Sequence, residues 1–158
     1  MALKFRSTDR FVKPDPVYGS RVVSKFLGCL MHQGKRSVAE RTFYQAMEVI
    51  KERVEDKDPL QVFEQALGNI KPVIEVRSRR VGGMTYQVPT EVSDKRQVSL
   101  AMRWILEAAR AKGGRAMHVR LANEFLDAYR RQGTAWDRRE NTHKMAEANR
   151  DFSHFSMR

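Results

Sequence analysis

Apolar residues along most of the chain recur at the three- and four-residue spacing that is typical of amphipathic helices. Residues 20–34 show the pattern first, with Phe26, Leu27 and Leu30 on one stripe and Cys29 predicted to face the core. Start signals follow the chain, because Ser37 and Glu40 have the spacing of a capping box, and an aspartate precedes Pro59. The pattern predicts five core-forming helices, over residues 20–34, 38–55, 58–71, 93–112 and 117–131.

A sixth helix is predicted over residues 135–150, but it differs in kind from the other five. Its sequence is polar nearly all round and offers a core only Trp136, Met145 and small alanines. Such a helix needs a partner surface, and its basic residues indicate a phosphate backbone. The alternative is a solvated terminal helix held by ion pairs.

Residues 72–89 are the one stretch patterned for β-structure. β-Branched or aromatic residues occupy both limbs, and Gly82-Gly83 between them can take the positive φ values that a tight hairpin turn requires. The stretch predicts a two-stranded ribbon whose base rests on helices while its tip projects.

Three arginines, Arg77, Arg79 and Arg80, stand close to this turn with only Glu75 nearby. Charge at a projecting tip gains nothing from the protein's own core, so the ribbon is predicted to meet an acidic partner such as nucleic acid. The alternative is an edge strand kept soluble by its arginines.

Length and composition set the domain organisation. The chain has 158 residues and 41% hydrophobic content, which suits one domain with a real core. Pro14 and Pro16 prevent an early helix. We therefore predict a mainly α fold, a six-helix domain with a protruding two-stranded β-hairpin arm: an extended N-terminal arm at 1–19, a single helical domain at 20–150 with the hairpin at 72–89, and a C-terminal tail at 151–158.

The charge points to a polyanionic partner. Thirty Lys and Arg residues against nineteen Asp and Glu residues give a net charge of +11 and a pI of about 10.2. No run approaches the ~20 apolar residues of a membrane-spanning helix, and Cys29 is the one cysteine, which excludes a disulfide framework and a thiolate metal cluster. We predict no cofactor, no metal site, no membrane partner and a reducing compartment.

Two other functions compete with a structural RNA-binding role. An architectural DNA-binding protein also uses basic β-arms, and Met84 at the tip would then be its wedge. An enzyme is not predicted, because the four histidines form no HExxH motif and the chain has no nucleophile elbow or P-loop.

Four blocks carry a resemblance to a known family: GKRSVAERTFYQAM (34–47), EVRSRRVGGMTYQVP (75–89), AMRWILEAA (101–109) and GTAWDRRENTHKMAEAN (133–149). In order and spacing they resemble bacterial-type small-subunit ribosomal protein seven. The resemblance implies a structural constituent of the small ribosomal subunit that binds the 3′ major domain of small-subunit rRNA and nucleates assembly of the head. It also implies a hairpin near the exit-site tRNA and mRNA, and neighbouring head and platform proteins as partners.

Carried over by motif, the resemblance implies a set of RNA-contacting residues and a hairpin tip. The RNA-binding residues are Lys35, Arg36, Arg77, Arg79, Arg80, Arg138, Arg139 and Lys144, and the tip by the exit-site tRNA is Gly82, Gly83 and Met84.

The sequence departs from the family at a few positions. Its start is less basic than the usual Arg/Lys tail, and Trp136-Asp137 replace an apolar-basic pair, so Trp136 is predicted to stack on a base or pack on a neighbour. The ending FSHF (152–155) resembles versions from bacteria related to the mitochondrial ancestor. The predicted location is a ribosome in the mitochondrial matrix or the bacterial cytoplasm.

Overall fold

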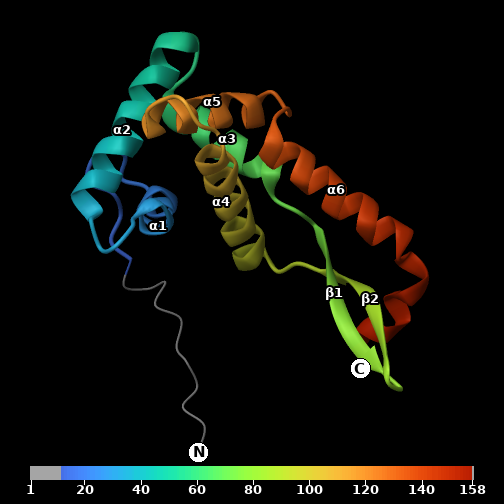
Figure 1. Cartoon of the computed structure of the whole chain (residues 1–158). Coiled ribbons are helices and arrows are strands. Elements are labelled where there is room, and N and C mark those ends of the chain that lie inside the picture. The colour runs from blue at the N-terminus through green and yellow to red at the C-terminus, as the bar shows by residue number, and fades with distance from the viewer. Residues whose placement is uncertain (1–11, 158) are drawn as a thin grey trace, which may run out of the picture.

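A computed structural model describes residues 12–157 of the chain, with side chains up to Ser153. Within these residues, a helical body carries a hairpin arm (Figure 1). This confirms the predicted mainly α, six-helix fold with a two-stranded hairpin. The elements are α1 (Arg21–Leu30), α2 (Arg36–Arg53), α3 (Pro59–Ile70), β1 (Ile74–Val81), β2 (Met84–Glu91), α4 (Asp94–Ala111), α5 (Met117–Tyr129), α6 (Thr134–Ala148) and the 3₁₀ helix η2 (Arg150–Met157).

Four phenylalanines form the centre of the body. Phe26 of α1, Phe43 of α2, Phe63 of α3 and Phe125 of α5 are all fully buried. The Phe63 and Phe125 rings meet edge to face, with centroids 5.2 Å apart, and Phe26 touches the other three rings. Such aromatic pairs add about 0.5–1.5 kcal/mol each to the burial of their area. One aromatic cluster therefore joins four helices.

The sequence predicted the N-cap of α3 correctly, but the predictions for Ser37 and Cys29 were wrong. Asp58 caps α3 as predicted, with its Oδ1 accepting the Leu60 N–H at 3.3 Å. Ser37 is not an N-cap, because the helical bonds of α2 already begin at the Lys35 carbonyl. Cys29 is exposed, since a position three after Phe26 falls at the edge of the buried stripe of α1.

Residues 16–18 form a turn before α1. Asp15 is buried, and its carboxylate accepts the N–H groups of Val17 and Tyr18 and the hydroxyl of Tyr44, the last at 2.7 Å. This turn stands where the sequence predicts an extended conformation. Residues 1–11 of the predicted N-terminal arm lie outside the described residues.

The hairpin has the tightest common turn. Val81 pairs with Met84, which leaves only Gly82 and Gly83 in the loop, with φ values of +59° and +88°. Two positive φ values are what a type I′ turn demands, and glycine adopts them without strain. The strands extend to Glu91, two residues beyond the predicted end of the arm.

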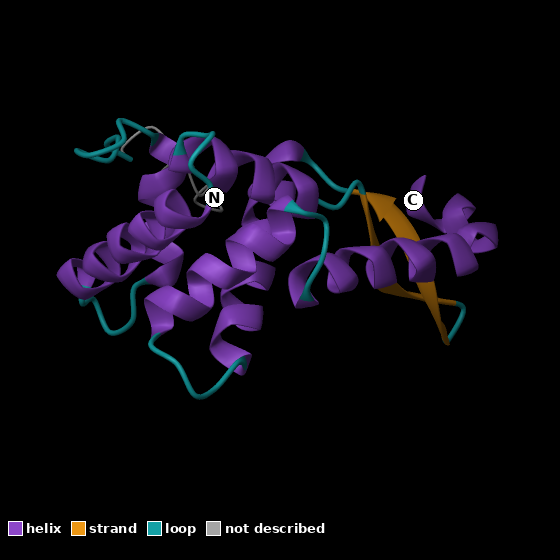
Figure 2. Cartoon of the chain, turned by 90° about the horizontal axis from the view of Figure 1, so that it is seen from above, coloured by secondary structure: helices purple, strands orange, loops and turns teal. Residues whose placement is uncertain are grey.

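The helices α6 and η2 pack against the arm and leave its tip, residues 80–85, exposed. Figure 2 shows α6 running alongside the strands. The Val73 N–H donates to His143 Nε2 at 3.2 Å, and the Tyr86 and Phe152 rings lie 5.4 Å apart. Burial, and then the nearby Arg139, lower the pKa of His143, which keeps its imidazole neutral and able to accept this bond.

The tip projects as predicted, with Met84 64% exposed, but packing extends beyond the base of the ribbon to Val88 and Tyr86. The partner surface that the polar sixth helix needs is the arm itself, together with the body at its start. Residues 151–157 of the predicted tail belong to the helix η2, which packs against β2.

The aromatic cluster generates a stability prediction. We expect Phe26→Ala to lower the free energy of unfolding by about 3–5 kcal/mol, because it leaves a cavity among three rings. Val38→Ala, at a side chain that is 49% exposed, should change it by less than about 0.5 kcal/mol. Denaturant unfolding of both variants measures the difference, and equal losses would contradict the central role of the cluster.

Candidate nucleic-acid interface

The three arginines of β1 do not share one surface. Side chains alternate along a strand, so Arg77 and Arg79, which are opposite Val88 and Tyr86, lie on one face of the ribbon, and Arg80 lies on the other. The first face is covered at Val88, which is fully buried, and at Tyr86, which packs on Phe152, while the Arg77 side chain stays about half exposed. The sequence alone grouped these arginines at the tip, and the register separates them.

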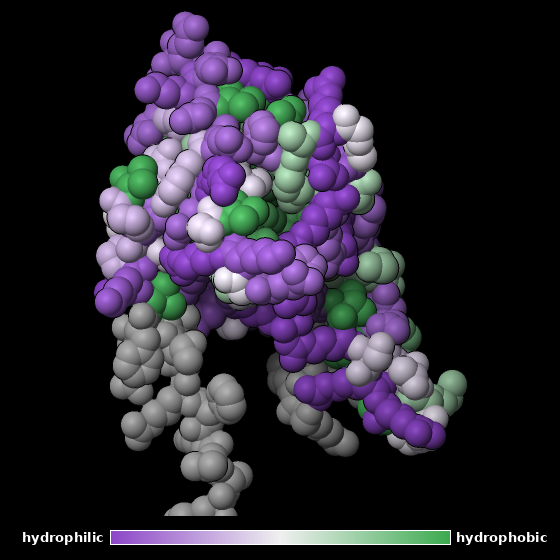
Figure 3. All heavy atoms as spheres, turned by 60° about the vertical axis from the view of Figure 1, so that its left-hand side comes forward, coloured by the Kyte–Doolittle hydropathy of each residue, from purple (hydrophilic) through white to green (hydrophobic). Residues whose placement is uncertain are grey.

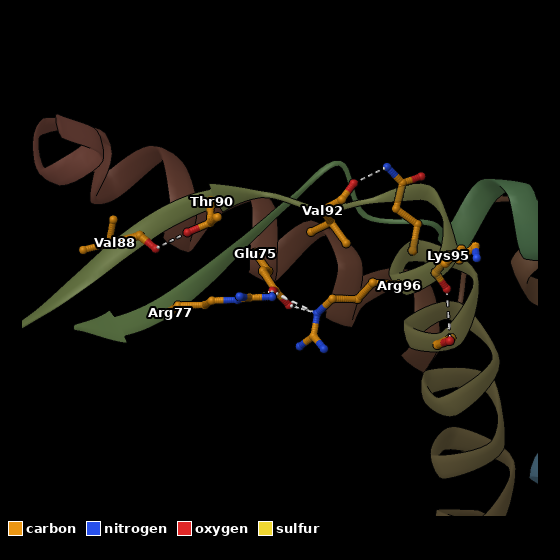
Figure 4. A network of polar contacts seen from close by, with 9 residues as sticks. Glu75, Arg77, Val88, Thr90, Val92, Lys95 and Arg96 are labelled. Atoms are coloured by element: carbon orange, nitrogen blue, oxygen red, sulfur yellow. Dashed lines mark hydrogen bonds and ion pairs between the residues drawn. The ribbon is translucent and has the colours of Figure 1, made fainter. Parts of the chain in front are cut away.

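Arg77 has an internal partner at the base of the arm. Glu75 is 7% exposed and accepts hydrogen bonds from Arg77 and from Arg96 of α4, whose Nε lies 2.9 Å from both carboxylate oxygens. Figure 4 shows the two guanidinium groups reaching Glu75 from opposite sides. Burial alone raises the pKa of Glu75, but the hydrogen bonds from Arg96 and Arg77 outweigh it and hold the pKa below its usual range.

On α6, both predicted arginines lie over indole rings. Arg138 pairs with Glu107 and lies 5.7 Å from the centre of the Trp104 ring, and Arg139 lies 4.5 Å from that of Trp136. Cation–π contacts of this kind contribute about 0.5–1 kcal/mol at exposed sites. Trp136 is half-buried against the core of its own protein, so it does not stand out as a stacking platform.

The remaining predicted cations are exposed: Lys35 and Arg36 at the start of α2, Arg80 on β1 and Lys144 on α6. Arg36 pairs with Glu40 one turn along α2 at 2.8 Å, a surface ion pair of small energy. Within the described residues, no acidic side chain pairs with Lys35, Arg80 or Lys144. A partner can therefore bind these three side chains without breaking an ion pair.

The structure brings these residues together in two groups, not one. The arm and α6 lie on one side of α4, and the start of α2 with Lys35 and Arg36 lies on the other (Figure 1).

A row of arginines on α4, which sequence reasoning missed, spans the space between the two groups. Arg96, Arg103 and Arg110 are exposed and seven residues apart, so they stay within about 20° per step on one side of the helix. Arg96 reaches the arm through Glu75, and Arg110 donates to the Leu30 carbonyl of α1 at 3.3 Å. Arg110 also lines a hollow of about 250 Å³ with Lys35. The heptad spacing of the arginines, opposite the buried face, was the signal that could have found this row.

The hairpin tip and the surface shown in Figure 3 offer a binding partner little apolar area. Met84 is 64% exposed beside the Gly82-Gly83 turn, and its Sδ accepts the Tyr86 hydroxyl at 3.8 Å. Figure 3 shows hydrophilic side chains over most of the face it presents, with hydrophobic ones scattered among them. A surface of this kind suits contacts through charge more than through apolar burial.

No group of three or more His, Cys, Asp or Glu side chains among the described residues could hold a metal ion. No described helix is long and apolar enough to cross a membrane.

A helical body thus carries a β-hairpin arm, and a row of exposed arginines on α4 lies between the two groups of cations. Residues 3–150 match the family model described as ribosomal protein S7p/S5e. The chain belongs to this family of structural, non-enzymatic ribosomal proteins.

Related sequences match this chain over nearly its whole length. The small ribosomal subunit protein uS7 of Thermotoga neapolitana is 54% identical over 150 residues, which cover 95% of this chain and 96% of that protein. The protein of the same name from Halorhodospira halophila is 56% identical over 146 residues, covering 92% of this chain and 93% of its own. That of Acidiphilium cryptum is 51% identical over 156 residues, covering 98% and 99%.

The Glu75 cluster generates a pH prediction. Because the pKa of Glu75 is lowered in the folded state, the carboxylate stabilises the fold above the ordinary glutamate value of 4.5, and this stability is lost as the pH falls through the folded pKa. Glu75→Gln should therefore unfold more easily than wild type at neutral pH, and the gap should close under acid. Denaturant unfolding between neutral pH and pH ~3 tests this, and a gap that is constant with pH would show that folding does not lower the pKa of Glu75.

Proposed function

We propose that this chain, a structural protein of the small ribosomal subunit by its family, binds the 3′ major domain of small-subunit rRNA. It nucleates assembly of the head there, with head and platform proteins as neighbours. The observation that carries this proposal is the cationic row of α4, continuous with the arm at one end and with Lys35 at the other.

Physical chemistry favours phosphate recognition at this surface. An A-form RNA helix hides its base edges in a deep, narrow groove, so a scaffold protein reads its shape through phosphates and 2′-hydroxyls. Rigid helices suit that task, because they fix the spacing of the charges before binding. The net charge of +11 makes the chain repel itself, and a bound polyanion reduces this repulsion.

Within this proposal the contacts divide by position. The residues that we assign to rRNA are Lys35, Arg36, Arg79, Arg80, Arg138, Arg139, Lys144 and, from the structure, Arg103 and Arg110. Arg77 and Arg96 have a second task, since both hold Glu75. Gly82, Gly83 and Met84 form the tip that we assign to the exit-site tRNA and mRNA.

The rRNA assignment predicts salt-dependent binding. Affinity for a transcript of the 3′ major domain should fall with rising salt, with a slope of roughly −0.7 to −0.9 per phosphate contact in a double-logarithmic plot. Arg103→Ala should weaken binding and reduce that slope by about 1, with an unchanged melting temperature. Lys51→Ala, an exposed cation at the other end of the body, serves as the control and should change neither.

Two results of the same titration would contradict the proposal. One is an affinity that hardly depends on salt. The other is equal affinity for duplex DNA of matched length, which would favour the architectural DNA-binding alternative.

The tip assignment predicts a separable defect. Deleting residues 81–84 and closing the shortened strands with an Asn-Gly turn should leave subunit assembly intact, because the helices that hold rRNA are untouched. Ribosomes carrying the deletion should retain or release exit-site tRNA abnormally, measured as tRNA occupancy and reading-frame fidelity. Normal values for both would make the arm only another rRNA anchor.

A further inference from the structure

The direction of the arm depends on α6, which starts on the body and ends beside the hairpin. At its start, Ala135 is buried among α4 and α5, and at its far half, His143 and Ala146 lie against the strands. A helix of 15 residues is ~22 Å long, so a tilt of about 10° at its start moves its far end by ~4 Å. Whatever fixes the first turn of α6 therefore helps to fix the arm, together with the ion pair between Glu75 and Arg96 at its base.

That first turn has no cap of its own. Gly133 is the N-cap residue and brings no side chain, so the free N–H groups of the helix need another acceptor. Glu124 of α5 supplies it: its Oε1 accepts the Ala135 N–H at 3.0 Å, and its side chain is fully buried. A carboxylate at a helix N-terminus is also favoured by the helix dipole.

A cation from a third helix holds this carboxylate. Lys112, at the end of α4, places its Nζ 2.6 Å from Glu124 Oε2 and 3.4 Å from Asp127 Oδ2. Burial alone lowers the pKa of Lys112, but the hydrogen bond and charge of Glu124, with Asp127, raise it overall, so the ammonium stays charged. The ends of α4, α5 and α6 thus meet at one ion cluster.

The α5–α6 turn fits tightly onto the same cluster. Gly133 has φ +89°, and a Cβ atom there would lie 2.9 Å from Asp127 Cβ and 3.5 Å from Glu124 Oε1. Only glycine allows the backbone to approach this closely at a positive φ. The tight fit of this turn therefore allows one position of the start of α6 relative to the ion cluster.

We propose that Glu124 is a positioning residue for the arm: held by Lys112, it caps α6 from inside the body and sets the direction in which α6 carries the hairpin. A buried ion pair adds little net stability compared with an apolar pair of the same shape, because desolvation offsets the attraction. What it supplies is one defined geometry, since any other placement leaves a buried charge or an N–H group without its partner.

The test measures the position of the arm in the free protein, so its result is independent of the proposed rRNA and tRNA roles. Nitroxide labels at Thr85→Cys on the arm and Gln61→Cys on α3, in a Cys29→Ser background, report their distance distribution by pulsed electron spin resonance. Wild type should give one narrow distance. Glu124→Ala should shift or broaden it by ~4 Å or more, as the geometry of a tilted α6 requires.

Matched variants separate positioning from stability. Glu124→Gln keeps an acceptor for the Ala135 N–H and should restore the wild-type distance even with a lower melting temperature. Glu107→Gln removes the exposed ion pair of Arg138, also between α4 and α6, and should leave the distance unchanged. Lys112→Met, at a side chain that is 37% exposed, should shift the distance in the same direction as Glu124→Ala and decides the matter if that variant does not fold.

Two outcomes would overturn the proposal. One is a wild-type distance in the folded Glu124→Ala and Lys112→Met proteins. The other is an equal shift in Glu107→Gln, which would mean that any loosening of α6 moves the arm.

Discussion

A two-stranded ribbon cannot support itself in water, and this constraint shapes the whole C-terminal half of the chain. The hairpin has no third strand, so its inner face, with Val88 and Tyr86, must be covered by something else. The helix α6 and the 3₁₀ helix η2 cover it, and a helix with almost no apolar side of its own is ordered in return. Arm and helix form one unit, attached to the body through Glu75 and Glu124.

Many of the cations have two tasks because charge also holds the fold together. Arg96 and Arg77 pair with the buried carboxylate of Glu75. Arg110 donates a hydrogen bond to the Leu30 carbonyl at the end of α1, and Lys112 forms an ion pair with Glu124. The cations left exposed, among them Lys35, Arg80 and Lys144, remain for a partner. A surplus of positive charge is thus distributed between internal cross-links and an outward surface, and one substitution can affect either or both.

The sequence by itself determined the element types and most of their limits. Periodic apolar residues such as Phe26, Phe43, Phe63 and Phe125 required helices with one buried side, and Gly82-Gly83 between β-branched limbs required a tight hairpin. These signals are local, because they lie within a few residues of the structure that they specify. The cationic character of the surface was equally readable, since it follows from composition.

Only the tertiary structure decided which of these charges face outward together. The register places Arg77 and Arg79 on the face of Val88 and Tyr86, and Arg80 on the other face. Arg77 and Arg96 both bind Glu75 at the base of the arm, and Arg103 and Arg110 extend the candidate interface along α4, whose polar side carried no motif. The cap on α6 comes from Glu124, eleven residues before the N–H group that it accepts. Such contacts join separate elements, and a pattern read along one element contains no information about the element packed against it.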